Sequence, residues 1–313
     1  MVTQKDDSRP TFLTFVDQLP EKVVRLYQRT PVVMTVMQPV RPKLINVFQS
    51  TQRALRERDV RRRGRAEATS SREDLESFFR MLSVVDPGLP MIRLGGDGEG
   101  GYVLPDDLDD LAACFSPGVS TVADFDLSLA ERGVPSFMAD ASVSGSPVDH
   151  PLFDFEATFV GTEDGDGWTR LDSWLSRKAP ETGDLLLQMD IEGSEWPVLM
   201  ATEQAVLRRF RIVILELHDV HRICLKSGLE EVGHTLGRLL EDFEMVHLHA
   251  NNNEKPVRHL GYEIPPVLEM TLLRKDRVRR STPVKALPHP LDVPNNEFMP
   301  EIELAPYWYA STW

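Results

Sequence analysis

Apolar positions in the middle of the chain fall into two kinds of segment. Short apolar runs predict strands, and longer segments with an apolar residue at every third or fourth position predict helices. We expect strands at Ala112–Ser116, Ser136–Ala139, Ala157–Gly161, Leu185–Asp190, Ile212–Glu216, Glu244–His249 and Val267–Leu273. We expect helices between most of them, for example at Asp124–Arg132, Glu195–Met200 and Leu229–Asp242. This alternation predicts an α/β domain over residues 71–280.

Two of these strands are nearly continuous apolar runs. The first reads LLLQMD and ends at Asp190, and the second reads IVILEL and contains Glu216. Runs of this kind are typical of central strands that are covered on both faces.

The segments that flank this domain have a different character. Residues 1–70 contain an arginine-rich run from Arg53 to Arg65, which we interpret as a helical, solvated extension. A docking surface for an acidic partner or for phosphate is the alternative. Residues 281–313 are rich in proline and end in aromatic residues between Tyr307 and Trp313, so we expect an irregular tail that packs on the domain.

Composition excludes several classes of protein. The net charge of −14 argues against nucleic acid as a partner, because phosphate binding needs a basic surface. The two cysteines, Cys114 and Cys224, have no zinc-site spacing, and a reducing cytoplasm suits them. No signal peptide is apparent at the start of the chain, and no apolar run is long enough to span a membrane. The sequence leaves a homo-oligomer open.

The first candidate site follows the strand at Ala112–Ser116. A turn of small residues from Ser116 to Ser120 leads into a helix, and the next strand ends at Asp140. Small residues let a backbone approach a ligand closely, and an acid at that strand end can accept hydrogen bonds from both ribose hydroxyls. The pattern is typical of a nucleoside-cofactor site, with an ordinary βαβ turn as the alternative.

Acids and imidazoles recur where later strands end. Asp190 ends one strand, Glu216 and His218 end the next, and His247 and His249 lie on one face of another. The carboxyl ends of strands are where open α/β sheets bind ligands. These residues therefore predict a catalytic or metal-binding cluster, with helix capping and structural histidines as the alternative.

A glycine-rich segment precedes the domain's first strand. Five glycines lie between Gly95 and Gly101, flanked by Arg93 and Tyr102. We interpret it as a loop that faces the cofactor, with Arg93 available for a carboxylate. A flexible hairpin is the alternative.

Together these motifs resemble the FkbM-type family of class I methyltransferases over roughly residues 90–296. The motifs are RLGGDGEGGYVLP, FSPGVS with DFDLSLAERG, LDSWL, LQMDIEGSEWPVL, ILELH, HLHANN and LPHPLDVPNN. The resemblance implies a Rossmann-like fold with a seven-stranded, mostly parallel sheet whose last strand is antiparallel. It also implies S-adenosylmethionine as the cofactor and, usually, O-methylation.

The resemblance also implies which residues bind the cofactor. Gly118 and Ser120 would line it, Asp140 would hold its ribose, and Gly101 and Tyr102 would lie near its methionine end. We add Ser116 and Asp190 to the positions expected to contact the cofactor.

Two chemical routes to methyl transfer are compatible with the strand-end cluster. His218 or Asp190 could remove the acceptor's proton as general base, with Glu216 beside them. Alternatively Asp190, Glu216, His218 and His249 could hold Mg²⁺ or Mn²⁺, which would lower the pKa of the hydroxyl. The expected acceptor is a hydroxyl on a sugar, a glycan or a secondary metabolite. A non-catalytic methyltransferase-like scaffold and a nicotinamide-dependent oxidoreductase are the alternatives.

Overall fold

The computed structural model describes residues 41–310. The first part of the predicted extension, residues 1–40, and the aromatic residue Trp313 therefore lie outside the described residues. The chain divides into two compact units, residues 1–48 and residues 49–313, and the description that follows is of the second unit.

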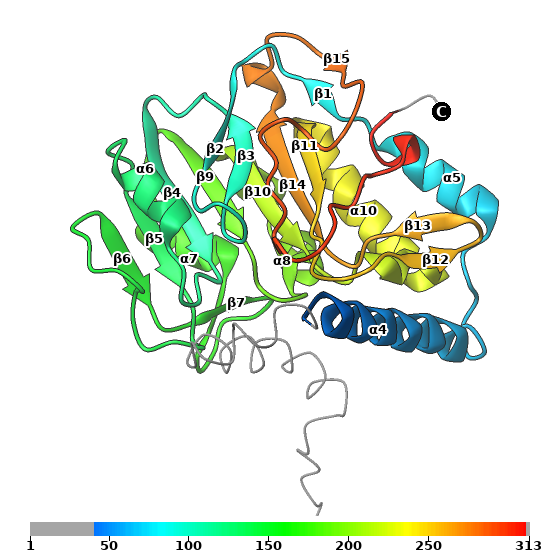
Figure 1. Cartoon of the computed structure of the whole chain (residues 1–313). Coiled ribbons are helices and arrows are strands. Elements are labelled where there is room, and N and C mark those ends of the chain that lie inside the picture. Colours follow the sequence, from blue (N-terminus) through cyan, green and yellow to red (C-terminus); the bar gives the residue numbers. More distant parts are fainter. Residues whose placement is uncertain (1–40, 311–313) are drawn as a thin grey trace, which may run out of the picture. The chain divides into compact units, whose positions relative to one another are not determined.

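A seven-stranded sheet forms the centre of this unit (Figure 1). Its strands, in spatial order, are β11 (Phe243–Ala250), β14 (Leu268–Arg274), β10 (Phe210–Leu217), β9 (Asp184–Met189), β4 (Leu111–Pro117), β5 (Ser136–Ala139) and β6 (Phe153–Glu156). Strand β14 is antiparallel to both of its neighbours, and all other neighbouring pairs are parallel. The predicted Rossmann-like fold, with its antiparallel last strand, is confirmed.

The third strand of the sheet is the one that the sequence misplaces. We expected it at Ala157–Gly161, but the sheet ends with β6, and β7 (Phe159–Gly161) pairs instead with β8 (Trp168–Arg170) in a small separate sheet. The sequence of β6, FDFE, alternates aromatic and acidic residues because this edge strand is only partly buried. It therefore lacks the continuous apolar run that identifies the central strands.

Helices follow most of the strands and begin close to the predicted positions. They are α4 (Arg41–Arg63), α5 (Arg72–Met81), α6 (Asp124–Ala130), α7 (Leu171–Lys178), α8 (Glu195–Ala201), α9 (Gln204–Leu207) and α10 (Lys226–Asp242). Short 3-10 turns lie at Val220–Cys224, Lys275–Arg277 and Pro306–Trp308. Helix α5 begins where Ser71 and Asp74 cap each other's backbone N–H groups, which satisfies donors that the first helical turn leaves unpaired.

Short antiparallel pairs complete the unit. They are β1 (Val85–Asp86) with β15 (Thr282–Pro283), β2 (Met91–Leu94) with β3 (Tyr102–Pro105), and β12 (Val257–His259) with β13 (Tyr262–Ile264). Among residues 41–310, no helix is both long and apolar enough to cross a bilayer.

The two faces of the sheet differ in polarity. On one face, side chains such as Phe115, Leu187 and Val213 join the buried helix residues Trp174 and Trp196 in the largest apolar core. The other face is apolar only where the strands begin. There Cys114, Leu186 and Ile212 pack with the β2–β3 pair and α6. Because side chains alternate along a strand, the positions two residues farther along share this second face, and several of them are polar.

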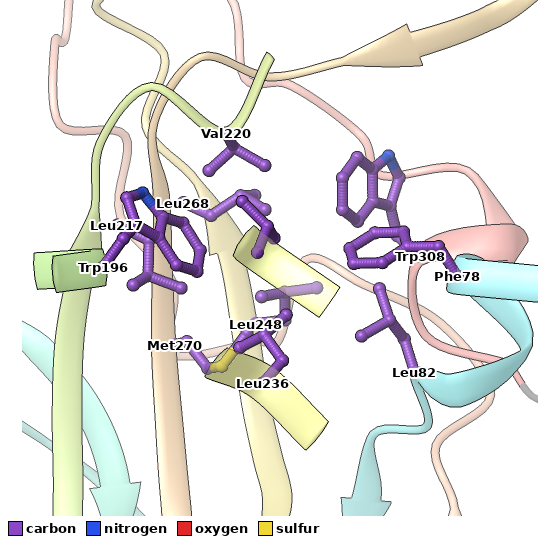
Figure 2. Close-up of a pocket in the computed structure, with 11 residues that line it drawn as sticks. Phe78, Leu82, Trp196, Leu217, Val220, Leu236, Leu248, Leu268, Met270 and Trp308 are labelled. Atoms are coloured by element: carbon purple, nitrogen blue, oxygen red, sulfur yellow. The ribbon is translucent and has the colours of Figure 1, made fainter. Parts of the chain in front are cut away.

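The C-terminal segment packs against α5. Trp308 is buried, lies edge-on to Phe79 at a ring-centroid distance of 5.0 Å, and donates from Nε1 to the Glu263 carbonyl at 3.1 Å. A cavity of about 10 Å³ remains beside it, where Phe78 and Trp308 face Trp196 across a wholly apolar lining (Figure 2). A dry apolar gap of this size is a packing defect of the core and has no polar group to hold a ligand.

Candidate functional site

A row of buried polar side chains crosses the second face of the sheet near the carboxyl ends of its parallel strands. The strand register places Glu216 beside Glu269, and Glu269 beside His249. The buried members of the row are Ser116, Gln188, Glu216, Glu269, Thr271, His247 and His249, and Asp190 continues the row as a half-buried side chain. Burial of so many polar groups is costly unless each finds partners, so their contacts indicate what the site does.

The turn after β4 is built so that only glycine fits at its centre. Gly118 has a φ of +89°, and a Cβ there would lie 1.5 Å from the Asp190 carbonyl oxygen. The turn is held by hydrogen bonds from Gly118 N–H to the Ala139 carbonyl (2.9 Å) and from Asp190 N–H to the Pro117 carbonyl (3.2 Å). The ends of three neighbouring strands therefore meet at this turn.

Asp140 ends β5 and is tied to the same turn. Its carboxylate accepts hydrogen bonds from the backbone N–H of Ser120 at 2.8 Å and of Ser142 at 2.7 Å, one on each oxygen. A carboxylate offers about four acceptor positions, so each oxygen keeps one for a ligand hydroxyl. Asp140 is thus fixed in orientation and still able to bind.

Ser116 and Tyr102 are joined through Gln188 of β9. Gln188 accepts from the Ser116 hydroxyl at 2.7 Å and donates to the Tyr102 hydroxyl at 3.2 Å. Ser116 also lies 3.2 Å from the carboxyl of Asp126, whose pKa burial raises to about 6. The Ser116 hydroxyl therefore belongs to a buried hydrogen-bond network that also includes Gln188 and Tyr102 and lies next to the turn.

The glycine-rich loop between β2 and β3 is closed by its own arginine. Arg93 donates to the carbonyls of Gly96 at 3.2 Å and Gly98 at 2.8 Å. A Cβ on Gly101 would lie 2.1 Å from the Gly96 oxygen and would also strike Arg93. Arg93 therefore holds the loop shut, and Gly101 is needed for this tight packing just before Tyr102.

The DIEGSE segment forms the most polar part of the site. Glu195 is fully buried and accepts hydrogen bonds from the backbone N–H of Ile191 (2.9 Å) and Gly193 (3.1 Å). It also lies 3.2 Å from Nδ1 of His218, whose own carbonyl accepts from Trp196 Nε1 at 2.7 Å. These contacts fix the ring of His218.

The other nitrogen of the His218 ring faces two carboxylates. Its Nε2 lies 3.9 Å from Asp190 Oδ1 and 3.6 Å from Glu192 Oε2. The Asp190 Oδ1 atom is buried and has no hydrogen-bond partner among the described residues. The predicted adjacency of Asp190 and His218 is therefore present, with an acceptor oxygen left unused between them.

Burial and charge separate the proton affinities of these two groups. Burial raises the pKa of Asp190, and the negative charges of Glu192 and Glu195 raise it further against the opposing effect of His218. Burial alone would lower the pKa of His218, but the hydrogen bond and charge of Glu195 outweigh it and raise that pKa to about 10. His218 is thus an imidazolium at neutral pH, while Asp190 titrates nearer neutrality than an ordinary carboxyl does.

Glu216 and His249 have partners of their own. Glu216 accepts from Asn251 Nδ2 at 2.8 Å, and burial followed by the charges of Asp190 and Glu269 raises its pKa well above the usual range. His249 contacts Glu269 through Nδ1 at 3.0 Å and Glu301 through Nε2 at 3.2 Å. Both of its ring nitrogens are therefore engaged.

The four residues that the sequence suggested as metal ligands, Asp190, Glu216, His218 and His249, therefore do not come together in one group. Strand β14 lies between β10 and β11, which separates His249 from the end of β10. Among the described residues, the group whose potential ligand atoms lie within 4.8 Å of one another is Asp190, Glu192 and His218. The group therefore includes Glu192 and lacks Glu216 and His249, which we had expected to belong to it.

A segment that we call the strap, residues 287–301, covers the far end of the row. Its Asp292 lies 2.8 Å from His247 Nε2, its Asn295 donates to Glu269, and its Glu301 contacts His249. The sequence signal for this arrangement was weak, because Glu269 is a single acid within the apolar run VLEMTLL.

One arginine of the N-terminal run joins two loops of the site. Arg56 in α4 donates two hydrogen bonds to Glu254, at 2.7 and 2.6 Å, and one to Asp219 at 3.2 Å. Asp219 directly follows His218, and Glu254 lies in the loop that begins with Asn251. Arg56 therefore ties the loop after β10 to the loop after β11.

The other ion pairs in this run are within the helix. Glu57 pairs with Arg53 and Arg61, and Asp59 pairs with Arg62 and Arg63. Pairs of this kind are typical of a solvated helix.

Part of the sequence is similar to a known protein family. No match to the chain was found among curated proteins. A family model described as the methyltransferase FkbM domain matches residues 137–262, a range that contains Asp140, Asp190 and His218. That family implies a methyl donor of the S-adenosylmethionine type. Residues 137–262 are therefore similar to the FkbM methyltransferase domain.

Proposed function

We propose that the protein transfers a methyl group from S-adenosylmethionine to a hydroxyl of a sugar, a glycan or another small-molecule acceptor. The observation that carries the proposal is the meeting of Gly118, Asp140 and Asp190 at the ends of three neighbouring strands. This is the edge of an open α/β sheet at which nucleoside cofactors bind.

The residues present fit this cofactor. Asp140 keeps acceptor positions for two ribose hydroxyls, and the Gly118 turn has no side chain to hold a ligand away from the backbone. The carboxylates of Asp190, Glu192 and Glu195 outnumber the single imidazolium of His218, which suits a positively charged sulfonium. When bound, the cofactor supplies an activated methyl group, and the protein must align the acceptor and receive its proton.

Asp190 is the best-placed general base. Its raised pKa gives it a useful proton affinity near neutral pH, and its Oδ1 atom has no partner that would compete for the proton. His218 is protonated and is therefore better suited to stabilise the negative charge around Asp190 than to accept a proton. Glu195 is the positioning residue that orients the His218 ring.

Cofactor binding tests the first half of the proposal. Asp140→Ala should weaken S-adenosylmethionine binding by about 1.5–3 kcal/mol, the scale for hydrogen bonds to a charged group, which is about 10- to 150-fold in Kd. Isothermal titration calorimetry measures this, with Asp149→Ala as the control because Asp149 is exposed on the same loop. Equal affinity in a folded Asp140→Ala variant would remove Asp140 from the site, and binding of NAD in place of S-adenosylmethionine would end the proposal.

A turnover assay tests the second part of the proposal, the transfer of the methyl group to an acceptor. With methyl-labelled cofactor and a cell extract as the source of acceptor, Asp190→Asn should lower transfer by about 100-fold or more while cofactor affinity stays near that of the wild type. Cofactor binding by the wild type without any transfer would favour a binding scaffold. Loss of transfer in EDTA that Mn²⁺ or Mg²⁺ restores would show that transfer needs a divalent cation, which Asp190, Glu192 and a deprotonated His218 could hold.

A further inference from the structure

An open groove of about 830 Å³ lies beside the small β7–β8 sheet, within the range of volumes that ligand sites occupy. None of the residues that we assign to the cofactor or to proton transfer lines it. Its lining comes from β8, from helices α7 and α9, and from residues next to β7, β8 and α9. The lining residues are Thr158, Asp164, Gly165, Trp168, Thr169, Arg170, Asp172, Ser173, Ser176, Arg177, Glu203 and Val206.

Two aromatic side chains at this groove are exposed to solvent. Trp168 is 47% exposed and Phe159 is 39% exposed, and their rings contact each other at a tilt of 41° with centroids 5.0 Å apart. An exposed aromatic pair costs hydration free energy that burial would recover, so its place beside a groove points to a ligand that covers it.

The indole of Trp168 is held in place. A Cβ on Gly161 would lie 2.7 Å from Trp168 Cε3, so the ring rests directly against the Gly161 backbone. Phe159 supports the same ring from the paired strand. The indole N–H of Trp168 has no hydrogen-bond partner among the described residues. The groove therefore presents a fixed aromatic surface together with an available donor.

The charges around the groove select the class of ligand. Two guanidinium groups and three carboxylates line it, and Arg170 already pairs with Asp172 at 2.5 Å. Arg177 pairs with Glu156 at 3.4 Å, just outside the lining. Because no positive charge is left in excess, phosphate and other anions are disfavoured. The remaining polar groups are hydroxyls and the carboxylates of Asp164 and Glu203, which hydrogen-bond well to a neutral polyhydroxylated ligand.

We propose that this groove binds a neutral saccharide, with a sugar ring stacked on Trp168 and its hydroxyls bonded to the polar lining. The C–H face of a sugar ring is apolar and covers an indole, while the ring's edge carries hydroxyls. This saccharide site is distinct from the methyl-transfer site, and it does not depend on the proposed function. It would hold a glycan whether or not that glycan is the methyl acceptor.

The test uses the full chain and a panel of neutral trisaccharides: cellotriose, maltotriose, mannotriose and chitotriose. At least one of them, at millimolar concentration, should shift the indole N–H signal of Trp168 in a ¹H–¹⁵N spectrum, and Trp168→Phe assigns that signal. In calorimetry, Trp168→Ala should weaken binding by at least about tenfold, the equivalent of about 1.4 kcal/mol. Phe159→Ala should weaken it less.

The matched control is Phe298→Ala, because Phe298 is as exposed as Phe159, at 39%, and does not line the groove. This variant should bind the trisaccharide like the wild type. The proposal is overturned if no member of the panel shifts Trp168, or if Phe298→Ala loses as much affinity as Phe159→Ala. A shift of Trp168 by inorganic phosphate alone would also overturn it. Calorimetry with S-adenosylmethionine, run in parallel, separates these outcomes from failure of the proposed function.

Discussion

Replacement of Gly118 by alanine tests whether the strand ends meet as closely as the structure shows. The new Cβ would lie 1.5 Å from the Asp190 oxygen, whereas ordinary contacts begin at 3.4 Å, so the turn or β9 would have to move by about 2 Å. That movement would break the hydrogen bonds from Gly118 to Ala139 and from Asp190 to Pro117.

The expected loss follows from three contributions. A left-handed φ costs an alanine about 1–2 kcal/mol, overpacking of a buried site costs about 1–3 kcal/mol, and each lost hydrogen bond costs about 1 kcal/mol. Lower entropy of the unfolded chain offsets about 0.4–1 kcal/mol. Gly118→Ala should therefore lower the free energy of unfolding by roughly 3–6 kcal/mol, a large part of the 5–15 kcal/mol that is typical of a domain.

Gly133→Ala is the matched control. Gly133 also has a positive φ, of +79°, but a Cβ there would meet no atom within 4 Å. It should cost only about 1 kcal/mol, the backbone contribution alone. Urea denaturation of both variants gives the comparison. If the two lose the same stability, the close approach of Gly118 to Asp190 is wrong, and so is our account of how the turn after β4 is held.

Two further predictions concern charged contacts. The folded state raises the pKa of His249 from its ordinary 6.5 to about 10, because hydrogen bonds to two carboxylates outweigh the effect of burial. The stability from this proton is therefore fully present below about pH 6.5 and is lost as the pH rises toward 10. The advantage of the wild type over His249→Gln in urea denaturation should shrink across this range, and a constant advantage would contradict the assignment. Arg56→Ala should lower the free energy of unfolding by about 1.5–3 kcal/mol, whereas Arg62→Ala, at a side chain that is 74% exposed, should change it by less than about 1 kcal/mol. Equal effects of the two substitutions would mean that Arg56 does not join the loops.

The sequence predicts the fold more completely than the site. Central strands such as Leu185–Asp190 are recognisable because burial on both faces demands an apolar run, whereas the edge strand Phe153–Glu156 has no such requirement. The adjacency of Asp190 and His218 followed from the order of the strands in the resembling family and from their ends.

The partners of these groups could not be predicted, because they depend on tertiary contacts. Glu195 looks like an ordinary acid at a helix start, yet it is buried under His218. Glu269 and Asn295 come from segments that sequence spacing does not relate to the other site residues, and only the folded chain brings them together.

The strap has a consequence for the order in which the chain can mature. During synthesis the strands that carry His247, Glu269 and His249 leave the ribosome before Asp292 and Glu301 do. Until the strap arrives, these buried groups lack part of their hydrogen bonding, and a sheet closed without it would leave polar atoms unpaired. The sheet can therefore reach its final packing only after the strap has left the ribosome, so the site is completed late in the synthesis of this domain.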